Sequence, residues 1–399
     1  MSGGRRRELE LISRICEHFA VRLLVISKTA EQDQANAELL ASSRCRIEVF
    51  PAVARHPGAP AGGAAHQVLR HRSPAGTMRI REIIAAERVD LVHVEGFYLM
   101  QHVPEWVEAP VLLVEQNIEY ELDRQRAHSR GERVTRLDSF SDCVRTQAAE
   151  LACWRRADRL AAVTWEDREL IREQMPDADV AVVPDGADHL PPRHGERSVG
   201  PIERPPAPRV TLLANFGYAP NVDAALHFCH EILPPIRAEV DDVHVWLVGN
   251  APPSEVRSLA SERVTVTGYV PDVRPYLDAA DVIVCPLRIG GGIKVKMIEA
   301  IRRGKAIVST RIGAQGLPAQ ARRALLVAED PTEFAHAVTT LLRDEPRRRL
   351  LERRAAAAAM KLPTWDESAA VLTKVYDELL DRSSRERNLE GSHLAGRSA

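Results

Sequence analysis

The sequence predicts an α/β protein made of two tandem Rossmann-like, doubly wound domains with a ligand cleft between them. The chain has 399 residues, of which 45% are hydrophobic, and this length exceeds one ordinary core. Short apolar runs rich in β-formers alternate with helical stretches, a pattern typical of βαβ units and parallel sheets. One proline-rich, charged stretch without periodicity, residues 191–208, interrupts the alternation and indicates a linker.

The first predicted domain covers residues 1–190. Its first helix is expected over 5–19, where apolar residues recur at helical spacing, and the first strand over 21–27. Further elements follow in order: strands at 45–52, 89–96, 109–117, 159–165 and 180–188, with helices at 75–88 and 141–157.

The beginning of this domain is unusual. An open α/β domain commonly starts with a strand that feeds a glycine-containing loop, whereas this sequence starts with the loop itself, SGGRRR at residues 2–7. Two explanations stay open: a first strand is missing from the sequence, or the domain is built without it. If the strand is missing, the sheet should show an unpaired edge or a gap.

The second predicted domain covers residues 209–363. Its strands are expected at 210–216, 243–250, 264–270, 281–287, 305–310 and 324–328, with helices at 222–236, 254–260, 273–280, 294–304 and 332–344. A last helix, at 364–382, is expected to pack back on the first domain. The polar residues 383–399 are expected to be disordered.

Composition limits the class of protein. The formal net charge is -2, from 54 basic and 56 acidic residues, which argues against a nucleic-acid partner. The six cysteines are scattered without a C-x-x-C pair, which indicates a reducing compartment and no structural zinc. No apolar run approaches the ~20 residues of a membrane span, and no signal-peptide core follows the N-terminus. We therefore predict a cytoplasmic protein.

The stretch PLRIGGGIKVKMIEA, residues 286–300, carries the strongest chemical signal. Gly290–Gly292 separate an apolar strand from a helix, and bare backbone N–H groups at a helix N-terminus suit a phosphate. Lys294 and Lys296 add mobile positive charge. Glu299 follows Lys296 on the same helix face and suits a ribose diol. The stretch predicts a nucleotide diphosphate site, and an ordinary βα loop without a ligand is the alternative.

Four segments of the second domain, at residues 210–228, 244–250, 264–287 and 290–317, resemble in order and spacing the carboxyl-terminal domain of family 4 glycosyltransferases, which have the GT-B fold. The resemblance covers about residues 2–381 and is strongest after Val210. The loop indicates a sub-branch with GGG-I-K-x-K. The family's E-x7-E motif is degenerate here, because Gly291 stands at its first glutamate, and its Arg/Lys pair is absent near Tyr218 and Asn221.

The resemblance implies a nucleotide-sugar-dependent glycosyltransferase of hexosyltransferase type. It implies a retaining reaction without a metal or other cofactor, with a UDP- or GDP-sugar as donor and a small molecule, glycan or lipid-linked sugar as acceptor. The residues expected to be catalytic are Lys294, Lys296 and Glu299. Those expected to bind the donor are Gly290, Gly291, Gly292, Ile293, Gly268, Tyr269, Asn221 and Ala300. On the acceptor side, loop and strand-end positions predict Gly3, Gly4, Glu95, Asn117 and Glu119.

Two other functions stay open. A sugar-nucleotide epimerase of the same fold would release UDP without transfer to an acceptor. A catalytically weak, sugar-nucleotide-binding partner subunit is favoured by the degenerate motif. The tryptophans Trp154, Trp165, Trp246 and Trp365 are predicted to be packing residues. The basic run Arg348–Arg354 predicts a solvated helix face, with peripheral contact to anionic lipid as the alternative.

Overall fold

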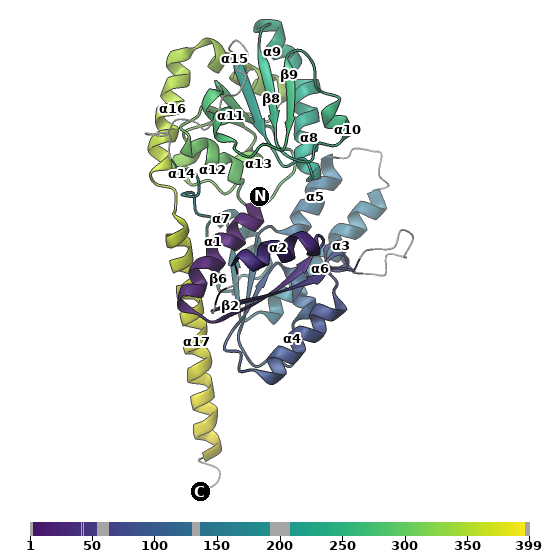
Figure 1. The fold of residues 1–399 in the computed structure, drawn as a ribbon, viewed down its shortest axis with the longest axis vertical. Coiled ribbons are helices and arrows are strands. Elements are labelled where there is room, and N and C mark those ends of the chain that lie inside the picture. The colour runs from purple at the N-terminus through teal and green to yellow at the C-terminus, as the bar shows by residue number, and fades with distance from the viewer. Residues whose placement is uncertain are drawn as a thin grey trace. The chain divides into compact units, whose positions relative to one another are not determined.

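The computed structural model of the chain describes residues 3–40, 42, 44–53, 64–129, 136–191 and 208–395 (Figure 1). It divides into two compact α/β units. The N-terminal unit contains Gly4–Asp185 and Trp365–Ala399, and the C-terminal unit contains Gly186–Thr364 together with Gly3. The two predicted Rossmann-like domains are confirmed. Nearly all of the predicted linker, residues 191–208, lies outside the described residues.

The C-terminal unit is built on one six-stranded, fully parallel sheet. Its strand order is β12-β11-β10-β7-β8-β9, so the chain starts in the middle and winds outward in both directions. This order places the topological switch point between β7 and β10, the position where doubly wound sheets bind ligands. The strands are β7 (Arg209–Leu213), β8 (His244–Val248), β9 (Val264–Gly268), β10 (Val282–Cys285), β11 (Ile307–Ser309) and β12 (Leu326–Val327).

Helices cover both faces of this sheet because its strands are apolar on both sides. Along β10, Val282 and Val284 join one buried cluster, while Ile283 and Cys285 join the other. The helices are α8 (Ala219–His227), α9 (Leu233–Glu239), α10 (Ser254–Arg257), α11 (Arg274–Ala279), α12 (Val295–Arg302), α13 (Arg311–Ala314), α14 (Ala319–Arg322), α15 (Pro331–Arg343) and α16 (Glu345–Ala359).

The single helix predicted over 222–236 is interrupted. A π-helical turn, η3 (Phe228–Ile232), separates α8 from α9. Pro234 and Pro235 follow directly and have no backbone N–H, so the regular pattern of helical hydrogen bonds cannot continue through them.

The boundary between the units lies at Asp185–Gly186, not after residue 190 as predicted. Two arginines at the end of α12 explain the difference. Arg302 donates from Nε to the carbonyl of Leu190 at 3.0 Å, and Arg303 donates from Nη1 to the carbonyl of Pro191 at 3.0 Å. Leu190 also packs into the core of the C-terminal unit, so this segment belongs to that unit.

The N-terminal unit contains two parallel sheets. One pairs β1 (Val21–Ser27) with β2 (Cys45–Pro51), and the other has the order β3-β4-β5-β6. Among the described residues, β1 pairs only with β2 and β3 only with β4, so each has an unpaired edge. The apolar side chains of β1 remain half-buried, whereas β4 is fully buried. The second sheet comprises β3 (Val92–Glu95), β4 (Val111–Glu115), β5 (Arg159–Ala162) and β6 (Val180–Val182).

The predicted N-terminal loop is part of a helix, which corrects its assignment as a cleft loop. Gly3 and Gly4 are the first residues of α1 (Gly3–His18), which buries Leu11 and Ile15 at helical spacing. The other helices of this unit are α2 (Ala30–Leu40), α3 (His66–Arg70), α4 (Pro74–Ala86), η1 (Phe97–His102), α5 (Glu119–Ser129), α6 (Arg136–Arg156), α7 (Trp165–Gln174) and α17 (Trp365–Ala395).

Helix α17 is longer than predicted (Figure 1). It continues to Ala395, through residues expected to be disordered, and no proline interrupts it. Its buried residues, including Trp365, Leu372 and Leu379, pack against Leu112 of β4 and Leu11 of α1. No helix in the described part of the chain combines the length and the apolar character needed to cross a bilayer.

Replacing Arg303 with methionine should destabilise the C-terminal unit. Arg303 is fully buried, and it donates from Nε and Nη2 to the two carboxylate oxygens of Asp278 at 2.9 and 2.6 Å. Removing one partner of a buried pair leaves an uncompensated charge, so Arg303→Met should lower the free energy of unfolding by about 3–5 kcal/mol. Urea titration measures this.

Two further variants control that experiment. Arg354→Met changes an exposed arginine and should cost less than about 0.5 kcal/mol. Arg303→Met combined with Asp278→Leu removes both charges and should regain much of the lost stability. A loss below about 1 kcal/mol for Arg303→Met alone would contradict a structural role for the pair.

Candidate functional site

The candidate site lies at the carboxyl ends of β7 and β10, on either side of the switch point. The loop after β7 leads into α8, and the glycine loop after β10 leads into α12. Gly292 has a φ of 58°, a left-handed conformation that favours glycine. At the end of β8, Gly249 allows close backbone contact, because a Cβ there would lie 1.6 Å from the carbonyl oxygen of Ala214.

Lys296 joins the two loops. Its Nζ donates to Oδ1 of Asn221 at 2.7 Å, and Nδ2 of Asn221 donates to the carbonyl of Asn215 at 2.8 Å. Burial lowers the pKa of Lys296 below its ordinary value. The predicted residues Lys296 and Asn221 therefore meet across the switch point, although the lysine is held in place and not mobile as predicted.

Lys294 is more deeply buried. Its side chain is 7% exposed, and its Nζ donates to the carbonyl of Gly292 at 2.9 Å and to Oε1 of Gln315 at 3.2 Å. A Cβ on Gly290 would lie 3.2 Å from the Cε atom of Lys294, so the loop packs around the lysine stem. This corrects the prediction of mobile charge: Lys294 holds the glycine loop in shape from inside.

Glu299 has a partner that the sequence did not indicate. Its Oε1 lies 3.5 Å from Nε2 of His189, whose side chain is almost completely buried, while one fifth of the Glu299 side chain is exposed. The partners of Lys296 and Glu299 lie in different segments, although both residues belong to α12. The carboxylate lies against His189 of the segment 186–191, and part of it stays exposed.

A second ionic bridge fixes the glycine loop against α8. Arg288 donates from Nε and Nη2 to the carboxylate of Asp223 at 3.0 and 2.5 Å. Glu231 lies 4.0 Å from Arg288 and 3.0 Å from Nδ1 of His227. These residues were not predicted from the sequence, because their contact depends on the strand order.

The other predicted donor residues differ in their surroundings. Gly268 ends β9 with a φ of 68°, and a Cβ there would meet nothing within 4 Å. Tyr269 follows it and is 73% exposed, so an open aromatic surface is present. Gly291 and Ile293 are half-buried in the loop. Ala300, which is also predicted to bind the donor, has a fully buried side chain in the hydrophobic core.

In the N-terminal unit, Glu95 ends β3 and is held in its ionised form. It accepts a hydrogen bond from Nε2 of Gln116 at 3.0 Å and lies 3.2 Å from Nε2 of His93. Burial alone would raise the pKa of Glu95, but the hydrogen bond and charge of His93, with the charge of Arg7, lower it to about 2. Arg7 itself is buried and donates to Oδ1 of Asp185 at 2.8 Å.

Three other carboxyl groups lie buried at the end of β4. Glu115 accepts from Nε1 of Trp154 at 2.9 Å and from the backbone N–H of Phe97 at 3.3 Å, and burial raises its pKa to about 8. Glu150, which was not predicted from the sequence, accepts hydrogen bonds from the first backbone N–H groups of α5. Burial also raises the pKa values of Glu119 and Glu150.

This burial changes the predicted acceptor set. The Glu119 side chain accepts from Nε2 of Gln67 at 2.9 Å and is 8% exposed, so it is a structural group and not an open ligand contact. Asn117, next to it, is half-buried. Gly3 and Gly4 lie in α1, so of the predicted acceptor residues only Glu95 and Asn117 stand at a strand end with part of the side chain exposed.

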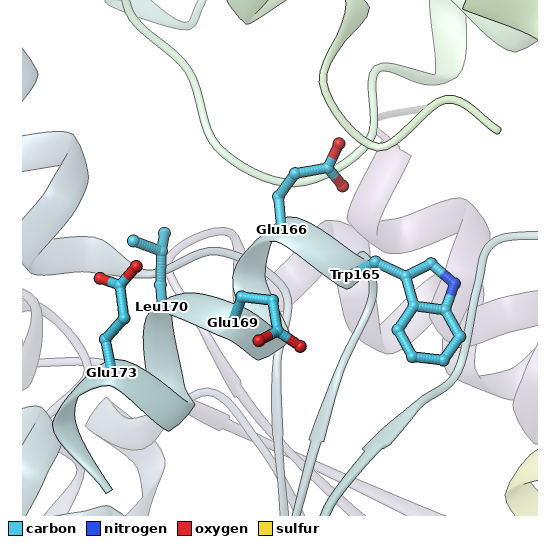
Figure 2. Close-up of a pocket in the computed structure, with 5 residues that line it drawn as sticks. All are labelled: Trp165, Glu166, Glu169, Leu170 and Glu173. Carbon is cyan, nitrogen blue, oxygen red and sulfur yellow. The ribbon is translucent and has the colours of Figure 1, made fainter. Parts of the chain in front are cut away.

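A hollow of about 440 Å³ lies along α7, directly after β5 (Figure 2). It is lined by Trp165, Leu170 and the carboxylates of Glu166, Glu169 and Glu173. Trp165 is 66% exposed, which corrects its prediction as a packing residue, whereas Trp154, Trp246 and Trp365 are buried. Arg168 lies over the Trp165 ring at 5.3 Å and pairs with Glu169 at 2.6 Å.

No group of three or more metal-ligating side chains occurs among the residues that the structure describes. The site groups found above are lysines, carboxylates, amides and aromatic rings. These can bind phosphate, hydroxyl groups and flat rings.

Comparisons with known proteins agree with this fold. Residues 207–344 match the sequence model of the family described as Glycosyl transferases group 1. A search of curated proteins gives no match. A structure of sucrose-phosphate synthase from Thermosynechococcus elongatus is similar with a TM-score of 0.62 and 17% identity, over 90% of this chain and 99% of that one.

Two more solved structures have the same arrangement of elements. HepE of Anabaena, in complex with UDP and glucose, gives a TM-score of 0.65 and 12% identity, over 94% of this chain and 96% of that one. A glycosyltransferase from Rickettsia africae ESF-5 gives 0.60 and 12%, over 95% of each chain. The fold of the chain is therefore GT-B, as predicted.

Replacing Glu115 with glutamine should change how stability depends on pH. In the unfolded chain Glu115 loses its proton near pH 4.5, whereas in the folded chain it keeps the proton up to about pH 8. The folded protein thus binds more protons between these values, and its stability falls as pH rises through this window. Glu115→Gln has no proton to lose, so its unfolding free energy should fall less, by on the order of 2–5 kcal/mol.

Urea unfolding at pH 5, 7 and 9 tests this expectation. Glu108→Gln, at an exposed position in the same unit, is the matched control and should follow the wild type at each pH. If the free energy of unfolding depends on pH in the same way for Glu115→Gln and the wild type, Glu115 is ionised in the folded protein at neutral pH.

Proposed function

We propose that this chain is a glycosyltransferase that moves a sugar from a nucleotide-sugar donor, bound in the C-terminal unit, to a hydroxyl-bearing acceptor. The observation that carries the proposal is the desolvated Lys296 ammonium beside the glycine loop at the switch point. The family match over residues 207–344 covers this same region.

Lys296 is suited to the diphosphate of the donor. Its ammonium group has three N–H bonds, and the described contacts use one of them, on Asn221. Burial lowers the pKa of the lysine because a charge is poorly solvated there, and a bound phosphate would supply the missing counter-charge. Lys294 would act indirectly, because it holds the carbonyl of Gly292 and so orients the loop N–H groups.

Glu299 and Tyr269 are suited to the nucleoside. The exposed part of the Glu299 carboxylate can accept hydrogen bonds from two ribose hydroxyls, with His189 orienting it from behind. The exposed Tyr269 ring offers a flat apolar surface to a base. The likeness to HepE, solved with UDP and glucose, supports a UDP-sugar over a GDP-sugar as the first donor to test.

The reaction breaks the bond between sugar C1 and the phosphate oxygen, and the electron pair leaves with the nucleoside diphosphate. The acceptor oxygen bonds to C1 and gives up its proton, for which the departing phosphate oxygen is an acceptor within the complex. Lys296 and the loop N–H groups would stabilise the negative charge that develops on the phosphate. We propose retention of configuration and independence of metal ions, with side-chain cations in the place of a metal.

A sugar-nucleotide-binding partner subunit is the second candidate. It is favoured by a specific observation: both loop lysines already bond to groups of the protein, and Gly291 supplies no carboxylate at the degenerate position. Such a protein would bind UDP or a UDP-sugar without transfer or hydrolysis. Measured turnover therefore separates the two candidates.

The hollow on α7 suits the acceptor. The exposed indole of Trp165 can stack on the apolar face of a sugar ring, and the flanking carboxylates can accept hydrogen bonds from its hydroxyls. Glu166 and Glu173 would repel a phosphate or carboxylate, so we propose a neutral or amine-bearing sugar as the acceptor. The α7 helix begins at the carboxyl end of β5, on the edge where open sheets bind ligands.

Substitutions at the donor site should separate by chemical role. Lys296→Ala removes charge where negative charge grows, so kcat for UDP release should fall about 10²–10³-fold while UDP affinity changes less. Glu299→Gln removes the carboxylate that would contact the ribose, and this contact has the same strength in the ground state and the transition state. The variant should therefore bind free UDP and the nucleotide-sugar donor more weakly by the same factor. Steady-state kinetics and UDP titrations measure both effects.

Lys374→Ala removes an exposed lysine of α17 and is the matched control, with no expected effect on either constant. If Lys296→Ala and Glu299→Gln leave UDP binding and turnover at wild-type values, the loop is an ordinary βα connection and the proposed function fails.

Replacing Trp165 with alanine should impair transfer and leave donor hydrolysis intact. The indole would contact the acceptor alone, so transfer to a sugar acceptor should lose about 1–3 kcal/mol, or roughly 10- to 100-fold in kcat/KM, while UDP release to water is unchanged. Trp106→Ala, at another exposed tryptophan, is the control. Equal losses in both reactions would place Trp165 in a structural or donor role instead.

A further inference from the structure

The outward face of α16 is strongly basic. Exposed residues recur every three or four positions at Arg347, Leu350, Arg354 and Ala357 of α16 and at Lys361 in the turn that follows it. Arg349 and Arg353 lie beside them, as does Met360, the residue that caps the helix. The opposite face buries Leu351, Ala355, Ala358 and Ala359 in the core. Figure 1 shows α16 on the outside of the C-terminal unit. The residues named for the outward face carry five cations and no carboxylate.

Most of these cations have no partner within the described protein. Arg349 pairs with Glu345, whereas no ion pair forms at Arg347, Arg353, Arg354 or Lys361 among the residues described. Arg348 is different, because its guanidinium points inward and donates to the carbonyl of Leu341 at 3.0 Å, at the end of α15. The basic run thus divides into one structural arginine and a charged face on which, among the described residues, Arg349 alone forms an ion pair.

Two large apolar side chains stand within this charged face. Leu350 is 40% exposed and Met360 is 73% exposed. A polyanion such as RNA would neutralise the arginines but would leave both apolar groups in water. A bilayer surface offers phosphate groups to the cations and, just below them, acyl carbon to Leu350 and Met360.

We propose that this face of α16 binds the surface of an anionic lipid bilayer, with the helix lying in the plane of the interface. The face is defined by Arg347, Arg349, Leu350, Arg353, Arg354, Met360 and Lys361. Its charge is complementary to phosphatidylglycerol or another anionic headgroup, although the whole chain has a formal net charge of -2. The contact is peripheral, and it would hold the C-terminal unit against the membrane.

Vesicle sedimentation tests the proposal with the full chain and no sugar substrate, so the result does not depend on the proposed transferase activity. The probes are vesicles of phosphatidylcholine with 25% phosphatidylglycerol and vesicles of phosphatidylcholine alone, at about 0.1 M salt. The wild type should bind the anionic vesicles at least tenfold more tightly. Arg353→Gln with Arg354→Gln should weaken this binding about 10- to 30-fold, since each surface cation contributes about 1 kcal/mol.

The matched control is Arg257→Gln with Arg263→Gln, which removes the same charge from exposed positions near β9, an edge strand of the sheet. It should bind like the wild type. Leu350→Ala with Met360→Ala should reduce the binding that remains at about 0.5 M salt, because that part is apolar. The proposal is overturned if the wild type does not bind anionic vesicles more tightly than neutral ones. It is also overturned if the control variant loses as much binding as the α16 variant. Binding to single-stranded RNA as tight as to the vesicles, with no effect of the apolar substitutions, would also overturn it.

Discussion

The hydrogen bond from Lys296 to Asn221 is the contact on which the candidate site depends. A doubly wound sheet separates the loops after β7 and β10, because the chain leaves these neighbouring strands in opposite directions. Without a bridge, the polar groups in that opening would have no fixed geometry. The Lys296–Asn221–Asn215 chain supplies the bridge, and the pair of Arg288 with Asp223 supplies a second one. The same lysine that orders the loops is the desolvated cation proposed for the phosphate.

The sequence allowed the fold and part of this site to be predicted. Apolar runs on both sides of polar loops identify parallel strands, because buried strands need apolar residues on both faces. The glycine loop was predicted from its residues. The positive φ of Gly292 explains why a glycine stands at that position. The partners of Lys294, Lys296 and Glu299 could not be read in this way. Gln315, Asn221 and His189 are distant in the chain, and only the strand order brings them to the loop.

Errors of prediction in the N-terminal unit have a similar cause. Glu95 ends β3 and Glu119 lies in the segment after the neighbouring β4, and both were predicted from the sequence to contact the acceptor. In the structure, hydrogen bonds and positive charge keep Glu95 ionised, whereas burial raises the pKa of Glu119. The exposure and the neighbours of a carboxyl group decide whether its pKa is lowered or raised. The periodicity of helices and strands in a sequence does not predict either of them. Trp165 shows the converse, since a large aromatic side chain predicted to be in the core lies on the surface.

The division of the N-terminal unit into two sheets has a dynamic consequence. A two-stranded sheet is marginal by itself, so β1 and β2 depend on the helices packed against them, among them α4, where Gly76 comes close to Ile26. The strands β3 to β6 share a larger sheet with a fully buried central strand. Local opening should therefore require less free energy in β1 and β2 than in β4 and β5. Backbone amides of the smaller sheet would exchange with solvent hydrogen first, and the unit would behave as two cooperative folding segments within one domain.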